Sequence, residues 1–288
     1  MKRFFLIFFI LFCYGCLSTG STDLTGHLKT IKTATEELSK ASRPISDVEE
    51  YYVGRALAAR ILTNYKVLNN ALLIDYINLV GLSIAMHSER PNTYGGYHFT
   101  LLDTMEKNAF ACPGGIIFIT KGMLLSAKSE DELAAILAHE IAHINNKDGI
   151  SSIKSARWTE ALTIIGTQVA RTYTSAEISK LVSLFEGAID DVFKTIVVNG
   201  YSQQQEFSAD EKAVNYLKKA GYNPKALVDF ITNLNVQGSS GGGIMNTHPS
   251  SSARLEKLME TTFQIPVDIS SMNNRLERFK AVIKKTIQ

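Results

Sequence analysis

The sequence predicts an α+β domain that is mainly α-helical and contains one small β-sheet. Two short runs, Tyr97–Asp103 and Gly115–Thr120, have the apolar and β-branched composition of strands, and Pro113-Gly114-Gly115 introduces the second. Helical patterns precede these runs and continue after Gly122 almost to the end of the chain. With 288 residues, 45% of them apolar and 20% charged, the chain is long enough for one sizeable packed domain or two small ones.

The first helical section runs from Asp47 to Arg90. Val53, Leu57 and Ile61 recur at a spacing of four residues, which places them on one face of a helix. We expect a break at Asn69-Asn70. The apolar pattern continues after it in Leu72, Tyr76, Ile77 and Val80. Pro91–Gly96 then forms a turn-rich link to the first strand.

The section after Gly122 contains several helices. Ser129 followed by Glu132 has the pattern of a capping box, so a helix should begin there. Residues 159–197 are apolar and helical, but charged residues interrupt them, which argues against a membrane span. Asn199-Gly200 ends this section, a new helix opens near Ser202, and Gly238–Gly243 is a glycine-serine loop.

The first residues have the pattern of an export signal. Met1-Lys2-Arg3 is positive, Phe4–Phe12 is an apolar run too short to span a membrane, and Gly15 precedes Cys16. We predict a lipoprotein signal peptide at 1–15, with Cys16 as the lipidated first residue of the mature chain. Cleavage at a nearby position and retention as an anchor are the alternatives. Residues 16–46, rich in Ser and Thr, would tether a domain at 47–288.

Charge and cysteine content exclude some classes of function. The net charge is +2 and the basic residues are scattered, so no nucleic-acid partner is expected. Once the leader is removed and Cys16 is lipidated, Cys112 is the remaining cysteine, so neither a disulfide framework nor a cysteine metal cluster is expected. Cys112 lies in an apolar run and should be a small buried residue.

The segment His139-Glu140-Ile141-Ala142-His143 predicts a metal site. Four residues on an α-helix make just over one turn, so both imidazoles point the same way and can share one ion. Glu140 lies beside the first ligand, where its carboxylate can take a proton from metal-bound water that attacks a peptide carbonyl. The alternative is an amphipathic helix with two solvated histidines. The flanking residues are apolar nearly all round, however, which indicates a buried helix and favours one Zn²⁺ per chain as the partner of the buried Glu140.

A catalytic zinc of this type needs a third protein ligand and an open fourth position. The remaining histidines, none with helical spacing to the first pair, are His27, His87, His98 and His248. Glu206 and Asp210 are one turn apart and would share a helix face. Glu206 could ligate the metal while Asp210 accepts a hydrogen bond from the far nitrogen of a ligand histidine. Taken alone, this pair reads as an exposed acidic face, and the His-Glu-His motif reverses that interpretation.

The H-E-x-x-H motif followed by Glu206-Phe207-Ser208-Ala209-Asp210 resembles a gluzincin metallopeptidase family. This family contains the CAAX prenyl endopeptidase, HtpX and the periplasmic peptidases LoiP and BepA, and the resemblance covers about residues 47 to 262. Further matching blocks, in the right order, are Asn108–Gly115, Glu132–Ala135, Tyr201-Ser202, and Thr247–Ser250 with Arg254. The chain departs from the family at Asn145–Asp148 and at Gln203, which leaves the surroundings of the ligands open.

The resemblance implies a zincin-like single domain whose small sheet lines the active-site cleft. In the family the Pro-Gly-Gly strand is the edge beside the cleft, so substrate would add to Gly115–Ile119 as an extra strand. The substrate-binding residues expected on this basis are Asn108, Ala109, Gly115, Ile116 and Ile117. His248 and Arg254 would be catalytic residues that stabilise the oxyanion formed on attack. In some relatives the equivalent histidine occupies the open metal position, and His248, which follows the glycine-rich loop, is expected to be such a gate.

We therefore expect a zinc-dependent endopeptidase with His139, His143 and Glu206 as ligands and Glu140 as general base. The resemblance implies polypeptide substrates among misfolded envelope proteins and a lipid-anchored location on the periplasmic side of the outer membrane or at the cell surface. The alternative is a zinc-retaining binding or chaperone-like lipoprotein with latent activity, gated by His248. Glu140 discriminates, because a structural zinc site does not need a carboxylate beside its first ligand. An integral-membrane prenyl-protein peptidase is excluded, because no mature segment is long and apolar enough.

Overall fold

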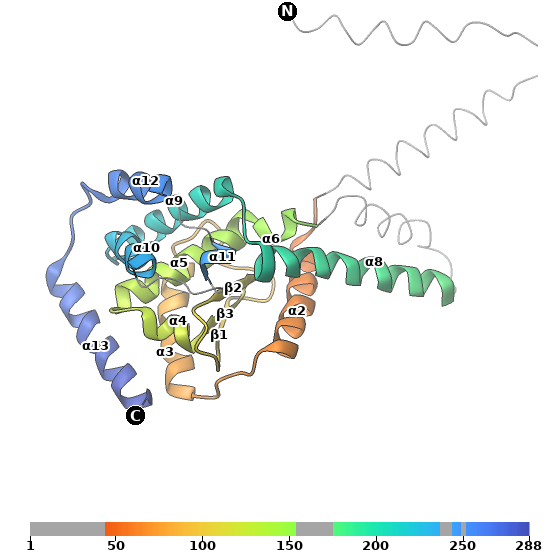
Figure 1. Cartoon of the computed structure of the whole chain (residues 1–288), viewed down its shortest axis with the longest axis horizontal. Helices are drawn as coiled ribbons and strands as arrows, with labels where there is room; N and C mark the ends of the chain where they lie inside the picture. Colours follow the sequence, from red (N-terminus) through yellow and green to blue (C-terminus); the bar gives the residue numbers. More distant parts are fainter. Residues whose placement is uncertain (1–43, 154–174, 237–243, 249–251, 288) are drawn as a thin grey trace, which may run out of the picture.

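Helices surround one small sheet in the computed structural model, which describes residues 44–153, 175–236, 244–248 and 252–287 (Figure 1). The helices are α2 (Asp47–Asn64), α3 (Ala71–Ala85), α4 (Lys121–Ser126), α5 (Glu130–Asn146), α6 (Asp148–Ser151), α8 (Ser175–Phe193), the π-helix η1 (Lys194–Asn199), α9 (Gln203–Lys219), α10 (Lys225–Val236), α11 (Ile244–Thr247), α12 (Ser252–Thr262) and α13 (Ile269–Ile287). The strands are β1 (His98–Leu102), β2 (Ala109–Cys112) and β3 (Ile116–Thr120). This confirms the α+β, mainly helical architecture, including the break between α2 and α3 around Asn69-Asn70.

The sheet has the order β1-β3-β2, with β1 parallel and β2 antiparallel to β3. A tight turn joins β2 to β3, and Gly114 and Gly115 have φ values of 79° and 116°, which residues with a Cβ rarely adopt. The strand pattern of the sequence pointed to β1 and β3. β2 consists of Ala-Phe-Ala-Cys, whose small side chains give a weak strand signal, and the family resemblance was its indication.

The prediction that Gly115–Ile119 forms the edge beside the cleft is wrong. β3 is the central strand, and its backbone groups pair with β1 on one side and β2 on the other. A central strand has no free backbone donors or acceptors for a peptide to pair with. β2 pairs with β3 on one side, so its other side is an edge of this sheet.

The two faces of the sheet pack against different helices, because successive side chains of a strand point to opposite faces. Leu101, Ala109, Ala111 and Ile117 lie in the larger core with α3, α5, α9 and α10. Leu102, Phe110, Cys112 and Phe118 lie in a second core with α2, α8 and η1. Cys112 is fully buried, as predicted.

Helix α5 runs through the interior, and its residues from Glu130 to Ile144 are all buried. The Ser129 side chain accepts a hydrogen bond from the Glu132 N–H, so the helix begins where the sequence predicts. The second half of the predicted capping box differs, because Glu132 Oε2 accepts from the Lys128 N–H at 2.9 Å. The helix ends at Asn146, and the next residue, Lys147, has a left-handed φ of 58°.

Two arginines of α13 fix the first turn of α5. Arg275 donates from Nε and Nη2 to the buried Asp131 carboxylate at 3.0 and 2.9 Å. Arg278 makes the same kind of paired contact with the fully buried Glu130, which also accepts from the Tyr76 hydroxyl. Carboxylates at a helix N-terminus also interact favourably with the helix dipole. The C-terminal helix therefore holds the start of the central helix in place.

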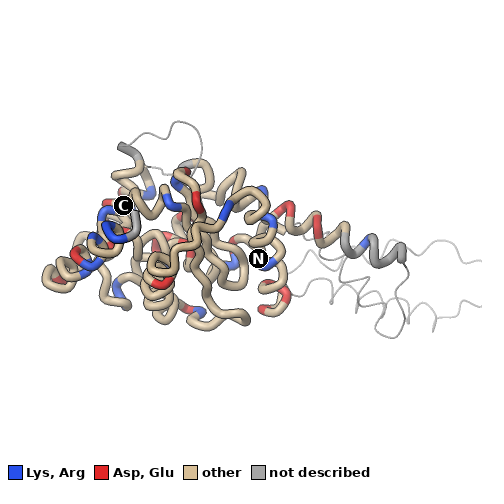
Figure 2. Tube along the Cα trace, turned by 90° about the horizontal axis from the view of Figure 1, so that it is seen from below, with Lys and Arg blue, Asp and Glu red and all other residues tan. Residues whose placement is uncertain are grey.

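Acidic and basic positions are interspersed along the described trace (Figure 2). Helix α8 extends away from the body of the molecule (Figure 1).

Among the described helices, none has an apolar stretch of the length that crossing a membrane requires. The predicted signal peptide at 1–15, nearly all of the tether at 16–46, and the Gly238–Gly243 loop lie outside the described residues.

A substitution at Gly54 tests how closely α2 packs on the turn between β2 and β3. An alanine Cβ there would lie 1.7 Å from the Pro113 carbonyl oxygen, so the backbone must move apart. Gly→Ala normally favours an exposed helix by about 0.5–1 kcal/mol, but overpacking costs about 1–3 kcal/mol. We expect Gly54→Ala to lower the free energy of unfolding measured by urea denaturation. Ala59→Ser on the exposed face of α2 is the control, and a raised denaturation midpoint for Gly54→Ala would contradict the packing.

Candidate metal centre

Two helices and one short segment supply the site. Helix α5 carries His139, Glu140 and His143, and α9 carries Glu206. Ser202 caps α9 through a full capping box with Gln205, so α9 begins where the sequence predicts. Alanines of both helices share one apolar cluster, and small side chains let helices pack closely. His248 follows α11 and reaches the same point from the other side.

The side-chain donors of His139, His143, Glu206 and His248 converge in space. His139 Nε2 lies 3.1 Å from His143 Nε2 and 3.2 Å from His248 Nδ1. The carboxylate oxygens of Glu206 lie 3.5 Å from His139 Nε2 and 3.5 Å from His143 Nε2. Ligands about 2.1 Å from a tetrahedral ion are separated from one another by roughly 3.4 Å. The four groups therefore fit a single metal ion of zinc-like size.

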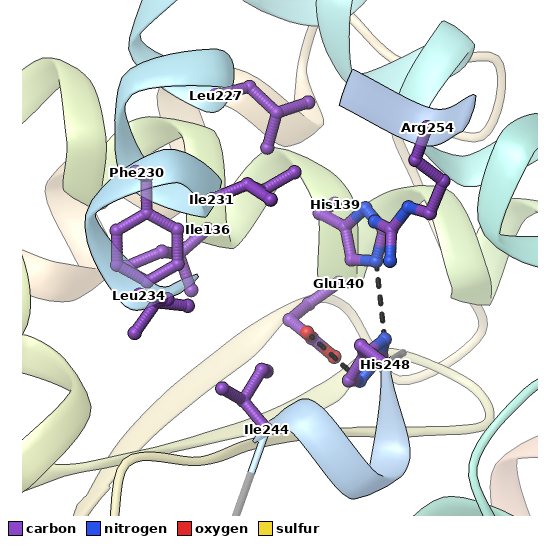
Figure 3. A pocket seen from close by; sticks show the side chains of 10 residues that line it. All are labelled: Ile136, His139, Glu140, Leu227, Phe230, Ile231, Leu234, Ile244, His248 and Arg254. Atoms are coloured by element: carbon purple, nitrogen blue, oxygen red, sulfur yellow. Dashed lines mark hydrogen bonds and ion pairs between the residues drawn. The ribbon is translucent and has the colours of Figure 1, made fainter. Parts of the chain in front are cut away.

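His248 is the fourth member of the donor cluster. Its Nδ1 is 2.9 Å from Glu206 Oε1. Its Nε2 is 3.7 Å from Glu140 Oε1 (Figure 3). His248 is only 6% exposed. Residues 237–243 before α11 and 249–251 after His248 lie outside the described residues. In this arrangement His248 completes a set of four donors, the number that closes a tetrahedral site.

Asp210 and Arg254 lie behind the ligands. Asp210 Oδ1 is 3.0 Å from His139 Nδ1, the nitrogen that faces away from the other ligands. Arg254 donates from Nε and Nη2 to both oxygens of Asp210 at 2.7 and 2.8 Å, and its Nη1 is 2.5 Å from Glu206 Oε2. The sequence-based expectation was that Arg254 stabilises a reaction oxyanion. In this arrangement its guanidinium nitrogens contact the carboxylates of Glu206 and Asp210, and the oxyanion role stays a prediction.

His143 has two neighbours that sequence reasoning missed as site residues. Asp148 Oδ2 lies 2.7 Å from His143 Nδ1, and Asn146 and Gln205 donate hydrogen bonds to the same carboxylate. The Tyr201 ring stacks on the His143 ring, with centroids 4.1 Å apart and planes 19° apart. A possible signal was the carboxylate five residues after the second histidine, which the left-handed Lys147 turns back toward the ligand.

The carboxylates favour positive charge at the histidines. Burial lowers the pKa of His139, but contacts with Asp210 and Glu206 outweigh it and raise that pKa to about 10. For His143, contact with Asp148 and then Glu206 likewise outweighs burial and raises the pKa. Burial acts to raise the pKa of Glu206, yet the three imidazoles hold it well below its ordinary value. A bound cation would satisfy the same carboxylates without protonating the ligands.

Glu140 lies beside the donor cluster but is not one of its four members. It is 1% exposed, and its Oε2 has no hydrogen-bond partner among the described residues. A buried carboxylate oxygen is costly when it has no partner. Burial and then the charge of Glu140 raise the pKa of the neighbouring Tyr201 phenol well above its ordinary value, so this tyrosine is neutral. Glu140 Oε2 is therefore a buried carboxylate oxygen beside the donor cluster that has no hydrogen-bond partner in the described part of the chain.

The predicted substrate-binding residues are divided between two strands. Ile116 and Ile117 belong to the central strand, and Gly115 O accepts from the His98 N–H, so this group is not at a free edge. Ala109 begins the edge strand β2. The Asn108 side chain accepts hydrogen bonds from the Ala109 N–H and the Thr247 hydroxyl and therefore ties β2 to α11.

Comparison with known proteins agrees with this geometry. The sequence model described as Peptidase family M48 matches residues 74–262. The chain is 25% identical over 220 residues to the β-barrel assembly-enhancing protease of Escherichia coli K12, covering 75% of this chain and 44% of that protein. It is 28% identical over 156 residues to the mitochondrial metalloendopeptidase OMA1 of Schizosaccharomyces pombe (53% of this chain, 43% of that protein). It is 26% identical over 248 residues to a protease HtpX homologue of Dictyoglomus turgidum, covering 78% of each. The chain spans less than half the length of the first two relatives. The family model matches most of the chain, including the whole donor cluster, so the chain belongs to Peptidase family M48.

Proposed function

We propose that this chain is a zinc-dependent endopeptidase with His139, His143 and Glu206 as metal ligands. The observation that carries the proposal is the convergence of these donors beside a buried, unpaired carboxylate oxygen of Glu140. Imidazole and carboxylate donors suit zinc, and three protein ligands leave one position for the reaction. When bound, the ion supplies a Lewis acid that polarises the scissile carbonyl and acidifies water.

The protein side chains supply the rest of the mechanism. Glu140 takes the proton of the attacking water and passes it to the leaving amine. Asp210 and Asp148 contact the far nitrogens of His139 and His143, so the near nitrogens keep their lone pairs for the metal. Arg254 balances the charge of Glu206 and Asp210. The apolar surroundings of α5 exclude water, which strengthens each of these interactions.

Substrate would bind along the edge strand. β2 has one side unpaired within the sheet and packs beside α5, so an extended peptide could add there by main-chain hydrogen bonds. This mode of binding tolerates many sequences, because backbone groups supply the contacts. The strand that we propose for substrate binding is therefore Ala109–Cys112, in place of Gly115–Ile119.

His248 would be the gate of this enzyme. Its imidazole lies among the metal donors, and its neighbour Thr247 is bound to Tyr201 and Asn108. The same observation favours the second candidate function, a latent zinc-retaining binding or chaperone-like protein. The two candidates differ in whether release of His248 gives peptide-bond hydrolysis.

The cellular role we propose is envelope protein quality control. The support comes from relatives named for enhancing β-barrel assembly. Misfolded envelope proteins are the substrates proposed, and lipidation of Cys16 is the proposed attachment to the membrane, on the periplasmic or outer surface. Detection of a lipid on Cys16 by mass spectrometry of membrane fractions would test that attachment.

Glu140→Gln tests the catalytic assignment. The change removes the proton acceptor and keeps the shape of the side chain, so we expect casein hydrolysis to fall by at least about 10²-fold. Zinc content, measured by plasma mass spectrometry, should stay at one ion per chain. Equal activity in both proteins, including no activity in either with zinc bound, would contradict the enzyme proposal.

Asp148→Ala tests the contact behind His143. Loss of such a partner typically weakens metal affinity by about 10–100-fold, and we expect a loss of that size. Competition with a chromogenic chelator measures it, and Asp148→Asn, which keeps an acceptor oxygen, should lose less. Asp75→Ala on the exposed face of α3 is the matched control. Unchanged affinity in Asp148→Ala would show that the contact does not support the ligand.

His248→Ala tests the gate. Removal of the fourth donor should raise basal peptide hydrolysis, because the imidazole no longer competes with substrate. Steady-state cleavage of a fluorogenic peptide, with zinc content measured in parallel, provides the readout. A fall in kcat at unchanged zinc content would instead assign His248 to oxyanion stabilisation.

A further inference from the structure

An apolar pocket opens beside the metal centre (Figure 3). His139, Glu140 and His248 line one side of it, so a group bound there would be next to the reacting carbonyl. Neither the metal-site motif nor the edge strand explains why this space is present. Its lining indicates what kind of group it accepts.

The opposite wall consists of one face of α10. Leu227, Phe230, Ile231 and Leu234 follow the spacing of three and four residues that places side chains on one helix face. The remaining apolar residues of the lining are Ile136 from α5 and Ile244 from α11. Figure 3 shows the side chains of α10 and Ile136 gathered on one side and the polar groups on the other. A pocket with such walls gains free energy by burying apolar surface.

The charged groups in the pocket lining are not available to pair with a charged side chain of a substrate. The Arg254 guanidinium contacts Asp210 and Glu206, so an acidic group would compete with two buried carboxylates for it. Glu140 is needed as the general base in the proposed reaction. A basic side chain would therefore have no other carboxylate in the lining to pair with, and burying an unpaired charge is costly.

One wall of the pocket is hydrogen-bonded to the segment that leads into the proposed substrate strand. The Ile244 N–H donates to the Lys107 carbonyl at 2.8 Å, two residues before β2 begins. One residue therefore links the pocket wall to the start of the edge strand. A peptide on that edge would present alternate side chains to opposite faces, and one of them could enter the pocket.

We propose that this pocket binds the large apolar side chain of a residue adjoining the cleaved bond, and that Phe230, Ile231 and Leu234 determine its size. This rests on the proposed peptidase function. The preferred residues would be Leu, Met and Phe, while Asp, Glu, Lys and Arg would be excluded. Such residues are buried in folded proteins and accessible in unfolded ones, so the pocket would favour unfolded chains.

Sequencing of the cleavage products of a peptide library tests the preference. Replacing the apolar residue next to the cleaved bond by Ala should lower kcat/KM by at least about 10-fold, because missing methylenes cost about that much in an apolar pocket. Replacement by Asp or Lys should lower it further. Cleavage next to charged residues at rates similar to Leu would overturn the proposal.

Variants of Leu234 test which residues set the size. Leu234→Phe should shift the preference toward Val and Ala, and Leu234→Ala should shift it toward Phe and Trp. Val228→Ala is the matched control, because it truncates a half-buried side chain of α10 that does not line the pocket. Thermal unfolding of each variant confirms folding. An identical preference in all four proteins would remove α10 from substrate selection.

Binding measured without turnover separates this inference from the proposed function. In Glu140→Gln, fluorescence anisotropy compares labelled peptides that differ only in Leu or Asp at the selected position. Tighter binding of the Leu peptide by at least about 10-fold supports the pocket, even if wild type cleaves nothing. Equal binding, together with casein cleavage by wild type, would overturn the pocket and leave the peptidase function in place.

Discussion

The convergence of three imidazoles and one carboxylate inside an apolar interior constrains the rest of this structure. Polar groups buried at this density are stable when each has a partner, and here the partners extend outward in layers. Asp210 and Asp148 contact the histidines, and Arg254 balances Asp210 and Glu206. The chain must therefore bring α5, α9 and α12 together before the charges are compensated.

The same requirement explains why α5 is so well anchored. A helix that is buried on nearly every side is closely packed all round, so a shift in its position would disturb those contacts. Its N-terminal turn is fixed by two arginines of α13, and its C-terminal end turns at Lys147 so that Asp148 returns to His143. Elements far from the metal centre in sequence thus set the orientation of its ligands.

The side of the donor cluster formed by His248 and α10 has a different structure. His248 follows the one-turn helix α11, which is held by hydrogen bonds from Ile244 to Lys107 and from Tyr201 to Thr247. The wall opposite consists of apolar α10 side chains, which impose size and polarity without directional bonds. The donor cluster thus lies between a helix buried along nearly all its length and a short hydrogen-bonded segment.

The sequence alone determined the α+β class, the start of α2, α5 and α9, the burial of α5, and the residues His139, Glu140, His143, Glu206 and Asp210 as candidates for one site. These features depend on local patterns: caps, helical spacing and apolar flanks. The tertiary structure decided the strand order, which makes β3 the central strand and β2 an edge strand, because strand pairing joins residues by contacts that no local pattern specifies. It also decided that Arg254 contacts Asp210 and Glu206, that Asp148 and Tyr201 hold His143, and that one face of α10 borders the metal centre. Each of these depends on side chains from different helices meeting in three dimensions.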